Sequence, residues 1–533
     1  MKRTMMSLIG AGVALAAVTG VAAVAAPGGT ERGAPQGASR MPVQRSALLC
    51  PAPTSSEVGE TTYTAFAPKS AADAAGKDAA KGTAELLPAG TVKDSGGTGK
   101  GDKGDKGDKG GKDGKGGAVE GPQAVPPHDR KPVVPLKSAG TPVTATTSSS
   151  AAPALVGTAD GALAPGWSVQ QTTSVAAGAG RGLFGLSCVA PDTTFWFPGV
   201  NTGKDRQDYV HLTNPDSTQA VVDLELRGKD GRLAAGSGED ISVPPHTTVP
   251  VLLSTLVSSP GSADTDAALH VTTREGRVGA SVQATDAETG GDWLPAAADP
   301  APGAVLPGIP ADATSVRLTA VAPGDDADLK VQLATPTGLI TPAGVQTLHV
   351  KGGMTTTVDL KDITQGEAGS LVLTPADGGS KAPVAAALRV IRGKAGHQEM
   401  AFIPSARPVE ERATAADNRA KGSTLSLVAP EKGKDAKVTV TASAGSGGGA
   451  PASKTYTVKG GTTMAVEPPR PQGLKGSYAL TVEPVDGSGP VYAARTLAQP
   501  QGGIPAFTVQ TLPDDRGSVV VPTAGQDLSL LTD

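Results

Sequence analysis

One segment decides the organisation of this chain: Ser242-Val243-Pro244-Pro245-His246-Thr247-Thr248-Val249. It returns as Val350-Lys351-Gly352-Gly353-Met354-Thr355-Thr356-Thr357-Val358, with Val350 107 residues after Val243, and 108 residues later as Val458-Lys459-Gly460-Gly461-Thr462-Thr463-Met464. A constant spacing of this size indicates tandem copies of one structural unit. The Gly-Gly pairs in the second and third copies are interpreted as hairpin turns that need positive φ.

Inside each copy, apolar and polar residues alternate with period two in short runs rich in β-branched residues. Six or seven such runs in about 100 residues predict an antiparallel β-sandwich, and a unit of this size is too long for one propeller blade. The fold class is therefore expected to be all-β, with tandem immunoglobulin-like sandwiches at 201–300, 301–408 and 409–500. Representative runs are residues 209–213, 221–226, 316–320, 384–391, 438–441 and 478–482.

The bulk composition bounds the number of domains and excludes one class of partner. With 533 residues the chain is long enough for three or four domains. Only 3% of it is aromatic, while 71 glycines and 45 prolines indicate disordered stretches between ordered domains. A net charge of −4 argues against a nucleic-acid surface, which needs an excess of clustered Lys and Arg.

The amino terminus has the pattern of an export signal. Lys2 and Arg3 precede a mostly apolar run at 5–26 that ends in small residues around Ala23-Val24-Ala25. This predicts a signal peptide at 1–26, or an uncut membrane-anchor helix of the same extent, followed by a flexible tether at 27–44. In either case the protein is expected to be exported, either secreted or anchored to the extracellular side of the plasma membrane.

The chain contains two cysteines, Cys50 and Cys188. An even pair in an exported protein predicts one disulfide, and both cysteines are followed closely by Ala-Pro. Closing a loop of 138 residues stabilises a fold by roughly 4–5 kcal/mol in the chain-entropy description. The alternative is two free thiols in separate strands.

Ahead of the repeats, residues 45–200 are expected to form an amino-terminal β domain with a disordered insertion at about 68–150. The centre of the insertion is the repeated triplet Gly101-Asp102-Lys103, whose balanced charge is typical of a solvated loop. Since the insertion lies between the two cysteines, it is interpreted as part of one domain. Further strand candidates lie in a C-terminal tail at 501–533: residues 507–512 and 518–522.

The densest aromatic cluster is Thr194-Phe195-Trp196-Phe197-Pro198, and weaker echoes, Trp293-Leu294-Pro295 and Phe402-Ile403-Pro404, precede the later repeats. Such clusters could pack one unit against the next. They could equally form a ligand platform, because aromatic rings offer large flat contact faces. The candidate platform residues are Trp167, Trp196 and Trp293.

An enzyme needs convergent polar groups, and the sequence contains no G-x-S-x-G, S-x-x-K, H-E-x-x-H or C-x-x-C motif. His211, His270 and His349 fall in expected strands, where a histidine is more often a surface or half-buried residue than a ligand. The aspartates at 325–328 could bind calcium, although a solvated turn accounts for them as well. No catalytic residue, metal ligand or cofactor is therefore predicted.

Several of these features together resemble an uncharacterised family of actinobacterial envelope proteins, the domain-of-unknown-function family 5719. The matching features are the exported start, Cys50-Pro51-Ala52-Pro53, Cys188 with the aromatic cluster at 194–198, and Tyr209-Val210-His211-Leu212-Thr213-Asn214-Pro215. The likeness extends loosely over 46–500. The resemblance implies an envelope location and adds no catalytic residue.

The expected function is therefore that of a non-catalytic extracellular protein of the cell envelope, which acts by binding or scaffolding. Its expected partner is a cell-wall glycan or another envelope protein, with no nucleic acid and with membrane contact only through the N-terminal segment. One alternative is a carbohydrate- or peptidoglycan-processing enzyme with its site near Trp167 and Trp196. Another is a membrane-anchored accessory subunit of an envelope complex.

Overall fold

The computed structural model describes these parts of the chain: residues 39–69, 81–92, 124–127, 131–178, 180–233, 238–257 and 266–521. Apart from one short 3-10 helix, η1 (Leu253–Leu256), the regular elements in these ranges are β-strands. The prediction of an all-β fold built from sandwiches is confirmed. Within the same ranges, no helix has the length and apolar character needed to cross a membrane.

Two predicted features lie outside the described residues. They are the signal or anchor segment at 1–26 and the Gly-Asp-Lys run that begins at Gly101.

The chain divides into two compact units, and the smaller one contains both ends of the described chain. In it, β1 (Ser39–Pro42) pairs antiparallel with β39 (Ser518–Val521), so that Ser39 lies opposite Val521. β39 falls at the strand candidate expected at 518–522. The larger unit is Val43–Gly517.

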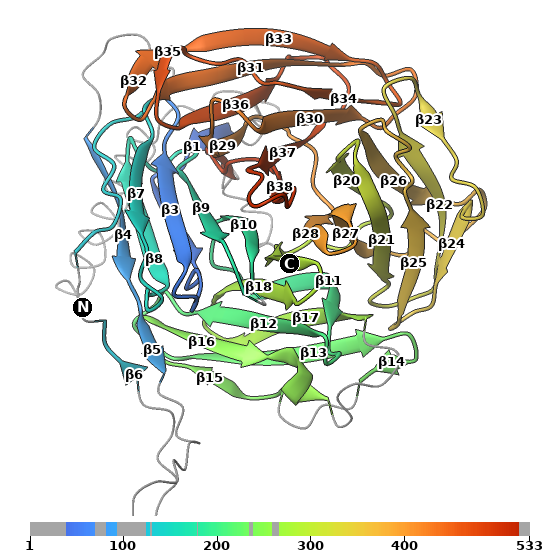
Figure 1. Cartoon of the computed structure of the whole chain (residues 1–533), viewed down its shortest axis with the longest axis horizontal. Helices are drawn as coiled ribbons and strands as arrows, with labels where there is room; N and C mark the ends of the chain where they lie inside the picture. The colour runs from blue at the N-terminus through green and yellow to red at the C-terminus, as the bar shows by residue number, and fades with distance from the viewer. Residues whose placement is uncertain are drawn as a thin grey trace, which may run out of the picture. The chain divides into compact units, whose positions relative to one another are not determined.

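The larger unit consists of four β-sandwiches in succession along the chain, coloured from blue to red in Figure 1. The first has one sheet of β2 (Arg45–Cys50), β8 (Leu155–Gly161) and β4 (Gly82–Pro88), and another of β10 (Gly182–Ser187), β9 (Ser168–Val175), β3 (Gly59–Phe66) and β7 (Val143–Thr147). The second has β11 (Thr194–Asn201), β17 (Asp266–Glu275) and β13 (Ala220–Gly228), with β14 (Gly231–Arg232) and β15 (Ile241–Val243), against β19 (Gly290–Leu294), β18 (Gly279–Asp286), β12 (Arg206–Thr213) and β16 (Thr247–Leu252).

The third and fourth sandwiches are built in the same way. The third has β20 (Ala304–Ile309), β26 (Gly369–Pro375) and β22 (Ala327–Ala334), with β23 (Leu339–Ile340) and β24 (Thr347–Val350), against β28 (His397–Pro404), β27 (Ala385–Lys394), β21 (Ala313–Val321) and β25 (Thr355–Lys361). The fourth has β29 (Ala413–Asn418), β36 (Tyr478–Pro484), β31 (Ala436–Gly445) and β33 (Ala452–Val458) against β38 (Phe507–Thr511), β37 (Tyr492–Ala498), β30 (Ser423–Ala429) and β34 (Thr462–Val466). β5 (Gly90–Val92) pairs with β6 (Ala124–Val125) and, in parallel, with β16, so these two short strands extend a sheet of the second sandwich. A separate short pair is formed by β32 (Gly448–Ala450) and β35 (Gln472–Lys475).

All four sandwiches share one connectivity. If the seven principal strands of each are counted along the chain, one sheet has the order 1-5-3 and the other has the order 7-6-2-4. Immunoglobulin domains instead place strands A, B, E and D in one sheet and C, F and G in the other. Because the amino-terminal domain has the same two strand orders as the three predicted repeats, it is a fourth copy of the repeated unit, which the sequence did not predict.

The strands form because their alternating side chains bury one face in the sandwich core. In β13, the buried side chains are Ala220, Val222, Leu224 and Leu226, and the residues between them are half-buried. They join a core cluster with the neighbouring strands of the second sandwich. Each fully buried Val or Leu stabilises the fold by roughly 1.5–3 kcal/mol relative to an exposed one.

The four sandwiches contact one another in a closed cycle. Their seventh strands meet in the order β10, β19, β28, β38 and back to β10, and the first strand of each sandwich packs on the sixth strand of the next. A polar contact crosses every interface: Gln283 to the Pro53 carbonyl at 3.1 Å, Arg317 to Asp266 at 2.7 Å, Thr463 to Ser370 at 2.9 Å, and Thr172 to Asp417 at 2.9 Å. Because the fourth sandwich returns to the first, neither is an exposed terminal repeat of an open array.

The repeated segment that revealed the copies lies at the entry to the fourth strand. Gly353 and Gly461 have positive φ angles of 74° and 85°, as the sequence predicted, and the first copy places His246 there with φ 51°. The prediction of hairpin turns is wrong, however, because β24 pairs with β22 while β25 pairs with β21. The segment crosses from one sheet of the sandwich to the other.

Three predicted boundaries also change. The supposed disordered insertion at 68–150 contains two strands of the first sandwich, β4 and β7, because Ala84 and Leu86 are buried in its core. β11 begins at Thr194, ahead of the boundary expected at 201, and β38 lies beyond the end expected at 500 and pairs with β37.

Candidate functional site

The three tryptophans predicted as a ligand platform are core residues. Trp167, Trp196 and Trp293 have exposed fractions of only 2%, 6% and 1%. A ring needs an accessible face to stack on a ligand, so the prediction of a platform is wrong.

The aromatic clusters pack one sandwich against the next, which was the alternative interpretation. Trp196 of the second sandwich contacts Val321 and Ala385 of the third. Its ring stacks on His270 with centroids 3.8 Å apart, and the guanidinium of Arg227 lies 5.5 Å from the ring centroid. His270 and Arg227 therefore occupy the ring surface of Trp196 on which a sugar would have to stack.

Two of the aspartates at 325–328 that could have bound calcium are occupied by other contacts. Asp326 accepts a hydrogen bond from the Gly352 amide at 2.8 Å, and Asp328 lies 2.8 Å from His349. Among the described residues, no group of three or more His, Cys, Asp or Glu side chains could hold a metal ion.

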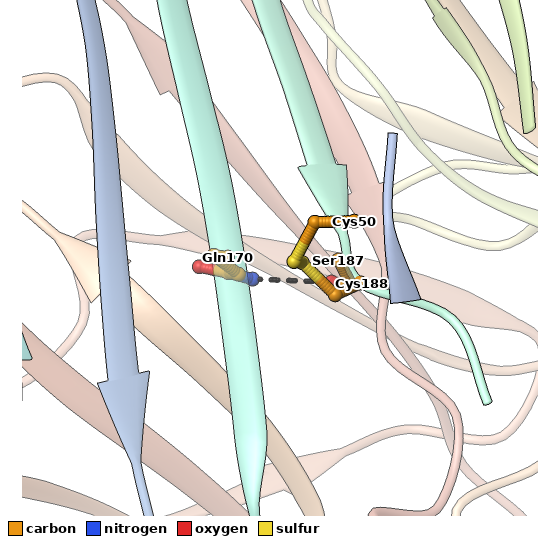
Figure 2. The surroundings of a disulfide bond; sticks show 4 residues. All are labelled: Cys50, Gln170, Ser187 and Cys188. Atoms are coloured by element: carbon orange, nitrogen blue, oxygen red, sulfur yellow. Dashed lines mark hydrogen bonds between the residues drawn. A yellow bond between two sulfur atoms is a disulfide. The ribbon is translucent and has the colours of Figure 1, made fainter. Parts of the chain in front are cut away.

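Cys50 and Cys188 form a disulfide, which confirms the prediction from sequence. Cys50 ends β2 and Cys188 follows β10, so the bond links the two sheets of the first sandwich. Figure 2 shows it beside Gln170 and Ser187, where the Gln170 amide donates to the Ser187 hydroxyl at 3.4 Å.

Gln170 also belongs to a polar network that joins the first and fourth sandwiches. Its side-chain oxygen accepts hydrogen bonds from the Asp417 backbone amide at 2.7 Å and from Arg495 at 2.9 Å. Asp417 in turn accepts from the Thr172 hydroxyl at 2.9 Å. We call Gln170, Thr172, Asp417 and Arg495 the seam, because these residues close the cycle of sandwiches.

The charges at the seam are buried. Asp417 and Arg495 have no exposed surface. Burial lowers the pKa of Arg495 to about 10, which still leaves the guanidinium charged at neutral pH. Asp417 is also held by Arg419, whose Nε lies 2.8 Å from one carboxylate oxygen and whose Nη2 lies 3.0 Å from the other. A buried charge of this kind is tolerated only while its partners remain in place.

Two further carboxyl groups are buried where the seventh strands meet. Glu399 of β28 accepts a hydrogen bond from the Leu183 amide at 2.8 Å, and Asp292 of β19 accepts one from the Gly185 amide at 2.9 Å. Both therefore join their strands to β10. Burial raises the pKa of Glu399 to about 8 and that of Asp292 well above its usual range.

Replacing Glu399 with glutamine is expected to make the protein more stable at pH 9 than the parent, with little difference near pH 4. The folded protein holds the Glu399 proton more tightly than the unfolded chain, so this group's contribution is fully present below its ordinary pKa and is lost as pH rises through about 8. Thermal unfolding at both pH values measures the change. The exposed Glu367→Gln is the matched control in the same sandwich, and an equal gain in that variant at pH 9 would contradict the assignment.

A pocket of about 370 Å³ lies beside the seam on the fourth sandwich. Its walls come from the loop between β29 and β30, from the segment after β34 and from the start of β36. The lining residues are Arg419, Ala420, Lys421, Gly422, Ser423, Glu467, Pro468, Arg470 and Tyr478. No sequence motif marks this group, because its members are spread from Arg419 to Tyr478.

The sequence model of one protein family, described as a family of unknown function (DUF5719), matches residues 143–469, which is more than half of the chain. Comparison with curated proteins and with solved structures finds no match. The matched range begins at β7 of the first sandwich and ends in the fourth, within the segment that lines the pocket.

Proposed function

The chain belongs to the family of unknown function DUF5719, and we propose that it is a non-catalytic protein of the cell envelope that acts by binding or scaffolding. In this proposal the protein is exported through its N-terminal segment, from an actinobacterial cell, and works on the outer side of the plasma membrane. Its partner is a cell-wall glycan or another envelope protein.

The observation that carries the proposal is the closed cycle of four sandwiches, with ionisable side chains placed between them. Asp266 and Asp417 make contacts that join neighbouring sandwiches, and Glu399 of the third sandwich accepts a hydrogen bond from the first. Groups used in this way hold a rigid body together. A disulfide fits export as well, since such bonds persist in oxidising compartments.

The alternatives differ in what supports them. The hypothesis of an enzyme site near the aromatic cluster assumed that its rings stack on sugars, and Trp167 and Trp196 are too buried for that. A membrane-anchored accessory subunit differs from the main proposal in having an uncut anchor and a dedicated partner. Mass spectrometry of the mature amino terminus distinguishes them: a terminus near residue 27 favours a secreted binding protein, and an intact terminus favours the anchored subunit.

The proposal is tested by co-sedimentation of the purified full chain with insoluble cell-wall material, before and after enzymatic removal of the wall polysaccharide. Binding that disappears with the polysaccharide supports a glycan partner. Binding that survives its removal points to a protein partner, which crosslinking in intact cells would identify. Absence of binding to untreated walls, together with absence of crosslinked partners in cells, would overturn the proposal.

A further inference from the structure

We propose that the pocket on the fourth sandwich binds an oxyanion, a phosphate or carboxylate group carried by a sugar of the envelope. The source of the sugar rests on the proposed function, whereas the preference for an oxyanion rests on the pocket itself.

The charge of the pocket wall favours an anion. The lining has three cations, Arg419, Lys421 and Arg470, and one carboxylate, that of Glu467, which pairs with Arg470 at 3.2 Å. Asp417, which is not part of the lining, pairs with Arg419, so the group as a whole carries 3 − 2 = +1 charge, and Lys421 supplies it. This local excess stands out in a chain whose net charge is −4. A concave surface of one sign concentrates ligands of the opposite sign.

The two arginines are held in place before any ligand arrives. Arg419 makes a two-pronged ion pair with buried Asp417, at 2.8 and 3.0 Å. Burial alone would lower the pKa of Arg419, but Asp417 more than offsets it and the pKa is raised. Arg470 donates to the Ala420 carbonyl at 2.9 Å and so connects the two walls of the pocket. Cations fixed in this way lose little side-chain entropy on binding.

Tyr478 provides the observation that points to a ligand. It lines the pocket and has no exposed surface, and its hydroxyl has no hydrogen-bond partner among the described residues. A buried hydroxyl left without a partner has lost its hydrogen bonds to water, and a ligand oxygen would replace them. Burial raises the pKa of Tyr478 to about 12, so at neutral pH the hydroxyl keeps its proton and can donate it to an oxyanion.

The rest of the lining favours a sugar-linked anion over an apolar ligand. Apart from Tyr478, the wall has no aromatic residue, and its apolar part is limited to Ala420 and Pro468. At about 370 Å³ the pocket is at the small end of the range for small-molecule sites, roughly 300–1,000 Å³. This is suited to one charged monosaccharide unit of a longer polymer.

The test is calorimetric titration of the purified full chain with glucose 1-phosphate, with glucuronate and with glucose. We expect one or both anions to bind and glucose to bind at least ten-fold more weakly. Binding of the phosphate alone or of the uronate alone identifies which oxyanion the pocket prefers. Equal affinity for glucose and for the anions, or no measurable binding of either anion, would overturn the proposal.

Substitutions inside and outside the pocket test whether the anion binds there. Arg470→Gln and Lys421→Gln should each weaken anion binding about ten-fold, and Tyr478→Phe should weaken it several-fold while preserving the ring. Lys437→Gln removes an exposed cation from the same sandwich outside the pocket and should leave the affinity unchanged. A loss in Lys437→Gln equal to that in Arg470→Gln would show a nonspecific charge effect and contradict the assignment.

Anion binding and wall sedimentation, measured on the same protein, separate this proposal from the proposed function. If the parent sediments with cell walls but binds neither anion, the pocket assignment fails and the envelope function stands. If the anions bind at the pocket but the protein neither sediments with walls nor finds a partner in cells, the envelope function fails and the oxyanion site stands.

Discussion

Replacing Asp417 with alanine is expected to destabilise the protein by about 3–5 kcal/mol, the usual cost of breaking a buried ion pair by removing one partner. The substitution removes the carboxylate that holds Arg419 and accepts from Thr172, and it leaves buried Arg495 with less negative charge nearby. Guanidinium-induced unfolding, followed by the shift in midpoint, measures the loss. Hydrogen exchange should accelerate first in β29 and β9, which pack together at the seam.

The control for this prediction is a surface ion pair of the same type. Asp299 pairs with Arg407, and both side chains are largely exposed, at 65% and 62%. Asp299→Ala should therefore cost no more than about 1 kcal/mol. Equal losses in the two variants would mean that the seam does not hold buried charges in solution.

Removing the disulfide is the second large effect. The double variant Cys50→Ser with Cys188→Ser is expected to lose about 2–5 kcal/mol of stability, because the unfolded chain regains the freedom of a long loop. Both positions are also buried, at 0% and 6% exposure, so the two introduced hydroxyls add a desolvation cost. Chemical unfolding of the parent and the variant measures the difference.

A reductant supplies the internal control for the disulfide, since the chain has only two cysteines. Reducing conditions should destabilise the parent nearly as much as the double substitution does and should leave the variant unaffected. A parent whose unfolding midpoint does not respond to full reduction would contradict the stabilising role of the bond.

The sequence predicts three of the four sandwiches because their fourth strands begin with one repeated turn. Gly353 and Gly461 mark two of the copies through positive φ, and His246 replaces glycine in the earlier copy. The first sandwich escaped detection because a low-complexity stretch separates β4 from β7 and hides the alternation around Leu86. Period-two patterns show which side chains face the core of a sandwich. They do not show that the fourth sandwich contacts the first.

The seam and the pocket could not be predicted for a related reason. Gln170 and Asp417 are 247 positions apart and become neighbours only when the cycle closes. In the pocket, Arg470 lies 50 positions from Ala420, whose carbonyl it contacts. The tryptophans were candidates for a binding site because aromatic residues are rare in this chain. Rarity does not distinguish a binding face from a packing face. Trp196 contacts Val321 and Ala385 of the next sandwich, so it is a packing residue.

One measurement tests the central claim, that this protein binds envelope material without transforming it. Purified protein is incubated with cell walls over several hours, and sedimented protein is measured together with the soluble reducing sugars and peptides that are released. The account predicts protein in the pellet and no release above that from walls alone. Release that grows with time and with protein concentration, and that is lost when a carboxylate is replaced, would contradict it.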